Sequence, residues 1–447
     1  MTEPAPRRRS ALRTAATTLG WDLPVFAAAT FVDQGGRLLL SLVAARLLGP
    51  ADFGEWVVLA LIIQYAGFGS LGVPQGAGRE VPKALGAGDD AGAAAIEDRA
   101  AAGSLVSAVG VAALSFALAP ALLGGPSTLP VTTLVLLAVC VFLQQLFLLE
   151  QVLYRSRLRF RQASVQLVAQ GLAAPIAGFG LLIAGWGVDG LLAARAVVLT
   201  VALVAATRTL ARVPRPVWDT AVIRRLAKIG LPLVAAGMLL LLLVTIDRWL
   251  VAVVLGRTAA GWYGLVGTAL SGLLVIPLLI SQQFYPRLAR ARGGGAPGAE
   301  ILRLARQQDL LAGVLTAAGS VVVAVAAIAL IPVVLPAYVP AIRPIVTVAA
   351  GVAVFAFASA DGNLLNLLDF QRRYLTIQAG VLVLDIAAAL ILMSLGAGID
   401  GVAAATASSM ALYGLVLHIA ADRAASAPTV GVAPVEPEIP APPPSAP

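Results

Sequence analysis

The chain of 447 residues is strongly apolar: 59% of its residues are hydrophobic, only 12% are charged, and the mean hydropathy is +0.91. Soluble domains carry about 25% charged residues to cover their surface, so this composition excludes a soluble enzyme, a secreted disulfide-stabilised domain and a disordered protein. The net charge of +8 does not indicate nucleic-acid binding, because the basic residues lie beside apolar segments. The sequence predicts an all-α polytopic membrane protein.

Twelve apolar segments are long enough to cross a bilayer as helices, since about 20 residues span its hydrocarbon core. They lie at residues 22–46, 55–74, 101–123, 129–153, 164–184, 187–207, 229–255, 262–284, 310–334, 344–368, 376–395 and 401–420. The first segment is too long for a signal peptide and lacks a small-residue cleavage site, so we expect it to be retained.

The expected organisation follows from these segments and from the composition of the ends. Two six-helix lobes are separated by a basic linker, and the C-terminal residues are rich in Pro, as in disordered polyproline-like tails. The predicted parts are a basic N-terminus at 1–21, an N-lobe at 22–210, a linker at 211–228, a C-lobe at 229–420 and a tail at 421–447.

The basic residues predict the orientation in the membrane. Of the 31 Lys and Arg residues, 25 fall before the first segment or after the even-numbered ones, and three fall on the opposite side; the remaining three are within segments. Cytoplasmic loops carry the excess of Lys and Arg, so both termini are expected in the cytoplasm of a bacterial-type plasma membrane.

The chain also contains an internal repeat. The motif from Leu48 to Trp56 recurs from Leu255 to Tyr263, an offset of 207, and the motif from Gly185 to Ala194 recurs at an offset of 211 from Gly396. Two matches at nearly one offset indicate a duplicated six-helix unit. Each half has an even number of spans, so the lobes are expected to be parallel repeats about a pseudo-twofold axis along the membrane normal, with the substrate path between them.

The sequence lacks the residues that several kinds of chemistry need. A single cysteine, Cys140, and a single histidine, His418, exclude a disulfide framework and a His-rich metal centre, and both are interpreted as packing residues. No phosphate-binding loop motif is present, so ATP is not the direct driver, and no cofactor is expected. Asp52 and Glu55 permit a membrane glycosyltransferase or polymerase as an alternative, although the outer loops are short and a helix cap suits these residues better.

Charged residues inside the apolar segments are the main candidates for function. Such residues cost at least ~2.5–3.5 kcal/mol at the centre of a membrane helix, so they face the protein interior or a wet cavity. Arg37, Arg195 and Arg248 are predicted to converge on a cavity for a phosphate-bearing ligand, because guanidinium groups suit phosphate. The predicted ion-coupling or cavity polar residues are Asp33, Asp247, Asp361 and Asp385.

Two alternatives remain open for these charges and their neighbours. Asp33 with Arg37, and Asp247 with Arg248, could be internal ion pairs that only lock helices together. The basic run from Arg155 to Arg161 could contact anionic membrane lipids, although a stop signal for topology explains it more simply. Amides within the segments, among them Gln144, Gln145 and Asn363, are candidates for hydrogen bonds between helices.

Motifs in both halves resemble those of oligosaccharide (O-antigen type) flippases, which belong to the multidrug/oligosaccharidyl-lipid/polysaccharide exporter superfamily. The resemblance covers about residues 20–420 and rests on the order and spacing of its motifs. These are Ala44–Gly54, Leu71-Gly72-Val73, Arg79-Glu80-Val81, Gly230-Leu231-Pro232, Ile246-Asp247-Arg248, Leu255-Gly256, Gly261-Trp262-Tyr263 and Phe284–Ala289. Asp247-Arg248 matches the family's acidic–basic pair in the seventh span, and Arg37 matches a cavity position more loosely.

The resemblance implies a flippase that moves a polyprenyl-diphosphate-linked oligosaccharide between leaflets by alternating access, coupled to a proton or sodium ion gradient. Twelve spans argue against the lipid II branch, which usually has fourteen. A multidrug/cation antiporter of the same fold is the first alternative, but it needs an acidic, aromatic-lined pocket. A non-transporting scaffold is a weaker one.

Overall fold

The computed structural model describes residues 7–123, 129–294 and 296–426, without the side chains of residues 7–31 and 33. Every regular element in these ranges is helical, and eleven of the described helices are long and apolar enough to cross a membrane. The prediction of an all-α, multi-pass membrane protein is therefore confirmed. The predicted tail falls on residues 421–447, almost all of which lie outside the described ranges.

The N-lobe contains the first six predicted spans. Its helices are α1 (Arg7–Ala66), α2 (Val73–Gly86), α3 (Asp90–Leu122), α4 (Val131–Ser156), α5 (Phe160–Ile183) and α6 (Gly187–Thr209). Helix α1 holds the first two spans, which are divided at Gly49 because its positive φ of 74° is not helical. The short helix α2 was not expected, since its residues lie in the basic loop after the second span.

The C-lobe repeats this arrangement with one break. Its helices are α7 (Thr220–Leu250), α8 (Arg257–Gly293), α9 (Gly298–Val334), α10 (Ile342–Ala356), α11 (Asp361–Leu367), α12 (Gln371–Ser394) and α13 (Gly398–Ser426). The tenth predicted span, 344–368, is discontinuous between α10 and α11. The break is stabilised because the backbone N–H of Ala360 donates to Asp309 Oδ1 at 2.7 Å.

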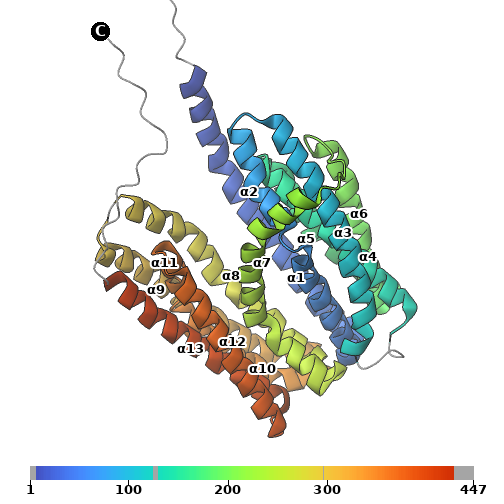
Figure 1. Cartoon of the computed structure of the whole chain (residues 1–447). Helices are drawn as coiled ribbons and strands as arrows, with labels where there is room; N and C mark the ends of the chain where they lie inside the picture. The colour runs from blue at the N-terminus through green and yellow to red at the C-terminus, as the bar shows by residue number, and fades with distance from the viewer. Residues whose placement is uncertain (1–6, 124–128, 295, 427–447) are drawn as a thin grey trace, which may run out of the picture.

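The two lobes lie side by side, and α7 runs between them. Figure 1 shows the N-lobe in blue to green, the C-lobe in yellow to red, and the first part of α7 beside α2. The backbones of α2 and α7 approach closely, because a Cβ at Gly76 would clash with the Leu226 carbonyl. The linker before α7 is tied to the N-lobe: Arg212 donates twice to Asp98, at 2.7 and 2.6 Å, and these bonds raise the pKa of that guanidinium.

Backbone conformations confirm the internal repeat. Residues at equivalent positions share the left-handed conformation that usually requires glycine. The φ value is 74° at Gly49 and 84° at Gly256, and it is 82° at Gly185 and 83° at Gly396. It is 55° at Gly187 and 54° at Gly398, and 56° at Leu158 and 66° at Asp369. The first pair has the offset of 207, and the other three have the offset of 211.

The lobes also contact each other symmetrically. A Cβ at Gly54 would clash with the carbonyl of Arg257, and a Cβ at Gly261 would clash with the carbonyl of Pro50. Gly54 and Gly261 are equivalent at the offset of 207, and so are Pro50 and Arg257. Such a reciprocal contact is what a pseudo-twofold axis produces. The lobes are therefore closed against each other at the end that carries the Gly49 and Gly256 turns.

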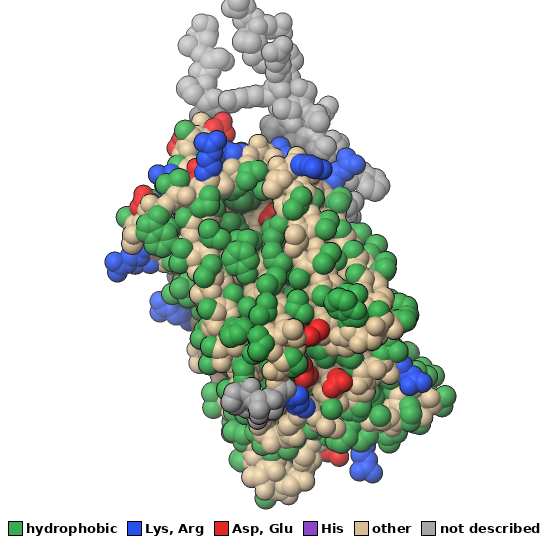
Figure 2. Space-filling view, turned by 90° about the vertical axis from the view of Figure 1, so that its right-hand side faces the viewer, with side chains coloured by type: hydrophobic (Ala, Val, Ile, Leu, Met, Phe, Trp, Pro, Cys, Tyr) green, Lys and Arg blue, Asp and Glu red, His purple; other side chains and the backbone are tan. Residues whose placement is uncertain are grey.

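Apolar side chains face outward over the middle of the molecule. Figure 2 shows the right-hand side of Figure 1, where hydrophobic side chains cover the centre of the face and Lys and Arg are more frequent toward the upper end. A soluble protein of this size rarely exposes so large an apolar surface. The band fits contact with lipid chains.

Candidate substrate cavity

A cavity of about 740 Å³ lies between the two lobes. Its walls come from α1, α4, α5 and α6 of the N-lobe and from α7 and α8 of the C-lobe. This size is within the range of ligand-binding pockets, about 300–1,000 Å³. The predicted path between the lobes therefore corresponds to a real space.

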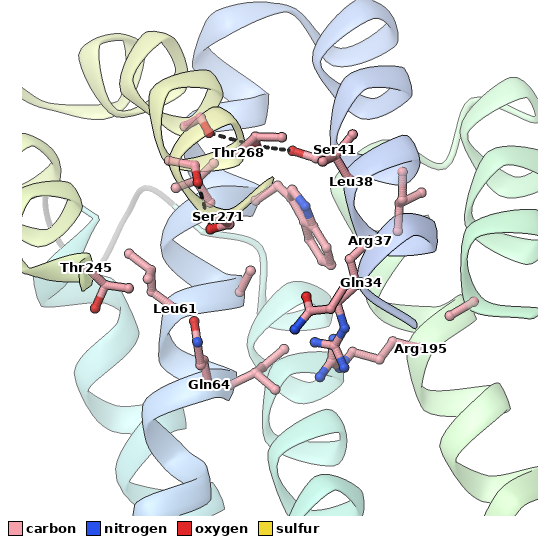
Figure 3. A pocket seen from close by; sticks show the side chains of 18 of the residues that line it. Gln34, Arg37, Leu38, Ser41, Leu61, Gln64, Arg195, Thr245, Thr268 and Ser271 are labelled. Carbon is pink, nitrogen blue, oxygen red and sulfur yellow. Dashed lines mark hydrogen bonds between the residues drawn. The ribbon is translucent and has the colours of Figure 1, made fainter. Parts of the chain in front are cut away.

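All three arginines selected from the sequence line this cavity: Arg37 on α1, Arg195 on α6 and Arg248 on α7. Figure 3 shows Arg37 and Arg195 extending into the same region, together with Gln34 and Gln64. The structure thus brings together residues that are up to 211 positions apart in the chain. Their role as substrate ligands stays a prediction.

Neighbouring side chains hold two of these arginines in place. Arg195 donates to Gln144 Oε1 on α4 at 2.9 Å, which is one of the expected hydrogen bonds between helices. Arg248 donates to the carbonyl of Gly267 at 2.9 Å and to Ser271 Oγ at 3.3 Å, both on α8. Gly267 is required here because a Cβ at this position would overlap the Arg248 guanidinium. No sequence pattern indicated this contact.

The rest of the lining is uncharged. Five glutamines and several hydroxyl groups lie among apolar side chains, and no Asp or Glu lines the described part of the cavity. The polar lining residues other than the arginines include Gln34, Gln64, Gln75, Gln144, Gln170, Ser41, Thr245, Thr268 and Ser271. Across the lobes, Ser41 and Thr268 share a hydrogen bond of 2.8 Å. The cavity is therefore cationic. Glutamines within the apolar segments are the sequence signal that could have identified its polar walls.

The predicted acidic residues are elsewhere. Asp247, Asp361 and Asp385 are buried and are not among the residues that line the cavity, and their role in ion coupling stays a prediction. The side chain of Asp33 lies outside the described residues. Asp247 accepts from the backbone N–H of Arg248 at 2.8 Å, while the Arg248 guanidinium reaches α8 instead. The described side chains of these two neighbours form no ion pair, which removes the locking alternative for them.

Asp247 and Asp385 belong to a buried polar group inside the C-lobe, with Tyr263 and Thr406. Each of the four side chains is at most 3% exposed. The Tyr263 hydroxyl interacts with Asp247 and with Thr406, and Asp385 interacts with Ser409. Burying a carboxylate is costly unless it is paired, so these two carboxyl groups stand out within the C-lobe.

Asp361 belongs to a different network, centred on Arg306. Arg306 Nη1 donates to Asp361 Oδ1 at 2.8 Å and to Asp309 Oδ2 at 3.0 Å. The same nitrogen lies 2.6 Å from His418 Nδ1, and Arg306 Nη2 donates to Asp422 Oδ1 at 2.7 Å. Asp309, Asp361 and His418 have the spacing of a metal site, but the guanidinium already supplies the positive charge between them. His418 therefore contacts this ion-pair network. Its interpretation from the sequence as a simple packing residue is wrong. Cys140 is a packing residue as expected: it is fully buried.

The lobes are sealed on one side of the cavity by polar and aromatic contacts. Glu55 accepts from Arg257 NH1 at 3.0 Å, and Arg257 Nε donates to the carbonyl of Leu123 at 3.1 Å. The Tyr338 hydroxyl donates to the carbonyl of Ala45 at 2.9 Å, and its ring meets Phe53 edge-on at 6.0 Å. Glu55 therefore links the two lobes, a contact that its position near a turn did not indicate.

Comparisons with solved structures identify the fold. An inward-facing multidrug resistance MATE family transporter of the MOP superfamily is 14% identical, with a TM-score of 0.70 over 90% of this chain and 98% of that one. The lipid II flippase MurJ, in an inward closed conformation, is 12% identical, with a TM-score of 0.70 over 89% and 87%. A MOP superfamily transporter from Pyrococcus furiosus, described as having a binding pocket of reverse polarity, is 13% identical, with a TM-score of 0.56 over 91% and 96%.

Comparisons of sequence identify the family. A search of curated proteins found no match. Residues 43–335, well over half of the chain, match the family model described as polysaccharide biosynthesis protein. This range includes all of the described cavity lining except the first part of α1. On this evidence the chain belongs to the polysaccharide biosynthesis protein family.

Proposed function

We propose that this protein is a flippase that moves a polyprenyl-diphosphate-linked oligosaccharide from the inner to the outer leaflet for cell-surface polysaccharide assembly. The observation that carries the proposal is the cavity itself, where Arg37, Arg195 and Arg248 gather and no carboxylate lines the described walls. A diphosphate is the part of such a substrate that resists crossing a membrane, and arginine binds phosphate oxygens through paired N–H groups. The glutamines and hydroxyl groups offer hydrogen bonds to sugar.

The polarity of the cavity distinguishes this function from drug export. A cationic drug would meet three arginines without an opposing carboxylate, an arrangement that repels it. The membership in a polysaccharide biosynthesis family favours the lipid-linked sugar further. A membrane glycosyltransferase is the least supported alternative, because Glu55, one of its two candidate acids, pairs with Arg257 across the lobes.

The ion gradient would act on the C-lobe rather than in the cavity. Asp247 and Asp385 would take up a proton or a sodium ion, since both are buried in one group with the hydroxyls of Tyr263 and Thr406. The cavity arginine Arg248 directly follows Asp247 on α7, so a movement of this helix couples the two sites. We place the protein in the plasma membrane with both termini in the cytoplasm, on the bias of its basic residues.

A reconstituted flipping assay tests the proposal. Vesicles containing the purified protein and a fluorescent polyprenyl-diphosphate oligosaccharide are treated with an enzyme or quencher that reaches only the outer leaflet. Arg195→Gln and Arg248→Gln should each slow flipping by about tenfold or more, the effect of losing one charge-assisted hydrogen bond. Arg303→Gln, which removes an exposed arginine away from the cavity, is the matched control.

Two results would contradict the proposal. Wild-type protein that does not accelerate exchange of this lipid, but does export a cationic dye in the same vesicles, would identify an antiporter instead. Equal flipping rates in the wild type and in both cavity variants would show that the arginines do not bind the diphosphate.

A further inference from the structure

A second cavity, of about 460 Å³, lies in the N-lobe between α5 and α6. We call it the α5–α6 groove. Its apolar walls are small or branched side chains that are exposed on the outside of the lobe: Val165, Ala169, Ala173, Val197, Val201 and Ala205. In its floor, Gln166 Nε2 on α5 donates to the carbonyl of Ala202 on α6 at 3.0 Å. This bond joins the two helices while their outer edges stay apart.

The groove adjoins the central cavity. Gln170 and Val198 line both spaces, and Arg195 lies one turn before Val198 on the same face of α6. Gln170 is 8% exposed, and its Nε2 has no hydrogen-bond partner among the described residues. A buried donor without a partner therefore lies at the junction, within one helical turn of a cavity arginine.

The opposite end of the groove is also cationic. Arg161, at the start of α5, lines it together with Gln162 and Thr209. The distance along α5 from Arg161 to Ala173 is about 18 Å at 1.5 Å per residue. Val165, Val197 and Val201 are 60–63% exposed, so the long side of the groove is open to the surroundings of the protein rather than enclosed.

These features fit one kind of occupant. An apolar channel that begins beside the arginine-lined cavity and opens sideways along the membrane-facing surface suits a hydrocarbon chain attached to an anionic head group. The central cavity, at about 740 Å³, is too small to enclose a whole polyprenyl chain together with an oligosaccharide. The chain of a lipid-linked substrate must leave the cavity, and the α5–α6 groove adjoins it at Gln170 and Val198.

We infer that the α5–α6 groove holds the head-proximal isoprene units of the polyprenyl carrier while the diphosphate lies at Arg37 and Arg195. This inference rests on the proposed function for the identity of the lipid. In the bound state the Gln170 amide donates to an oxygen of the diphosphate, such as the ester oxygen that joins it to the chain. The remaining isoprene units stay in the bilayer, so the protein transfers only the polar part through its interior.

Site-specific photo-crosslinking tests the inference. A benzophenone amino acid is placed at Val201 in the groove or at Leu412, its equivalent in the C-lobe at the offset of 211, which is 38% exposed. The purified protein is reconstituted in vesicles of phosphatidylethanolamine and phosphatidylglycerol with tritiated undecaprenyl diphosphate. We expect labelling at Val201 to exceed that at Leu412 by about tenfold or more. Tritiated phosphatidylglycerol in place of the probe should label both positions equally.

Filling the groove provides a second measurement. Ala169→Trp together with Ala173→Trp should abolish labelling at Val201 and slow flipping, whereas Ala117→Trp, at an exposed position on α3 away from both cavities, should change neither. Binding of inorganic diphosphate, measured as a thermal shift, should persist in the double variant because the arginines are untouched. A double variant that loses this shift as well is replaced by Val197→Phe, which narrows the groove by less and leaves position 201 for the crosslinker.

The outcomes separate the two proposals. Equal labelling at Val201 and Leu412, equally strong preferential labelling by phosphatidylglycerol, or normal flipping with a filled groove would each overturn the groove inference and leave the flippase proposal standing. Specific labelling at Val201 by a protein that does not move the lipid between leaflets would support the groove and refute the flippase proposal.

Discussion

At the scale of single residues, neighbouring positions on one helix serve different parts of the molecule. Asp247 and Arg248 are adjacent on α7, but the acid faces the C-lobe interior and the arginine crosses to α8. Successive residues of a helix are rotated by about 100°, which separates their side chains. The position of Arg248 depends on the absence of a side chain at Gly267, since its guanidinium lies where a Cβ would be.

Gly267→Ala should therefore reduce flipping without unfolding the protein. The added methyl group displaces the flexible end of Arg248, which can move, rather than a backbone segment, which cannot. We expect a change in the free energy of unfolding of no more than about 1 kcal/mol in either direction, since Ala is the better helix former, and a several-fold loss of flipping. Flipping is measured in vesicles and stability by thermal unfolding in detergent.

The control is Gly110→Ala on α3, where a Cβ meets nothing within 4 Å. Equal flipping by the two variants would show that the position of the Arg248 side chain is unimportant.

At the scale of helices, α1 and α8 form the seal between the lobes through backbone contact. Gly54 packs on the carbonyl of Arg257 and Gly261 on the carbonyl of Pro50, and both neighbours are backbone atoms that cannot rotate away. Glu55 and Arg257 add an ion pair to this contact. Small residues allow helices in membranes to approach closely, because packing drives their association there.

Gly54→Ala and Gly261→Ala should each weaken this seal and populate a conformation open on that side. A single cysteine at Ser271, which lines the cavity, reports the change in a Cys140→Ala background. We expect faster reaction of this cysteine with an impermeant maleimide added outside cells. Gly180→Ala on α5 meets nothing within 4 Å and serves as the control. An unchanged reaction rate in both glycine variants would mean that the contact does not close the cavity.

At the scale of the whole molecule, the two lobes and the cavity between them imply movement of one lobe against the other. The lobes are related by the repeat, they touch at the Gly49 and Gly256 turns, and the ligand site lies between them. Transporters built from such repeats expose the site alternately to each side of the membrane. The Glu55–Arg257 ion pair must then break once in every cycle.

Cysteines at Glu55 and Arg257, in a Cys140→Ala background, should be bridged by a bifunctional methanethiosulfonate that is about as long as the two side chains they replace. The bridge should stop flipping, and reduction should restore it. The side chains they replace approach to 3.0 Å across the lobes. Thr132→Cys with Asp189→Cys is the matched control, since these side chains also lie 3.0 Å apart but both belong to the N-lobe. Normal flipping by the bridged Glu55–Arg257 variant would refute alternating access by separation of the lobes at this end.

The sequence by itself determined the features that depend on local patterns. Apolar length located the spans, and the glycine motifs located the turns. The repeat predicted the two lobes, because the glycines that its left-handed turns need recur at equivalent positions in both halves. The three arginines were also found this way, since a charge in an apolar segment requires a polar environment.

Only the tertiary structure decided which direction each side chain takes. Asp247, Asp361 and Asp385 satisfy the same sequence criterion as the arginines, yet they are buried in the C-lobe, in two separate groups. The break before α11, the contact of Gly267 with Arg248 and the α5–α6 groove all arise from contacts between different helices. Their physical cause is the rotation of each helix about its axis, which is set by packing against its neighbours, whereas hydropathy fixes only that the helix crosses the membrane.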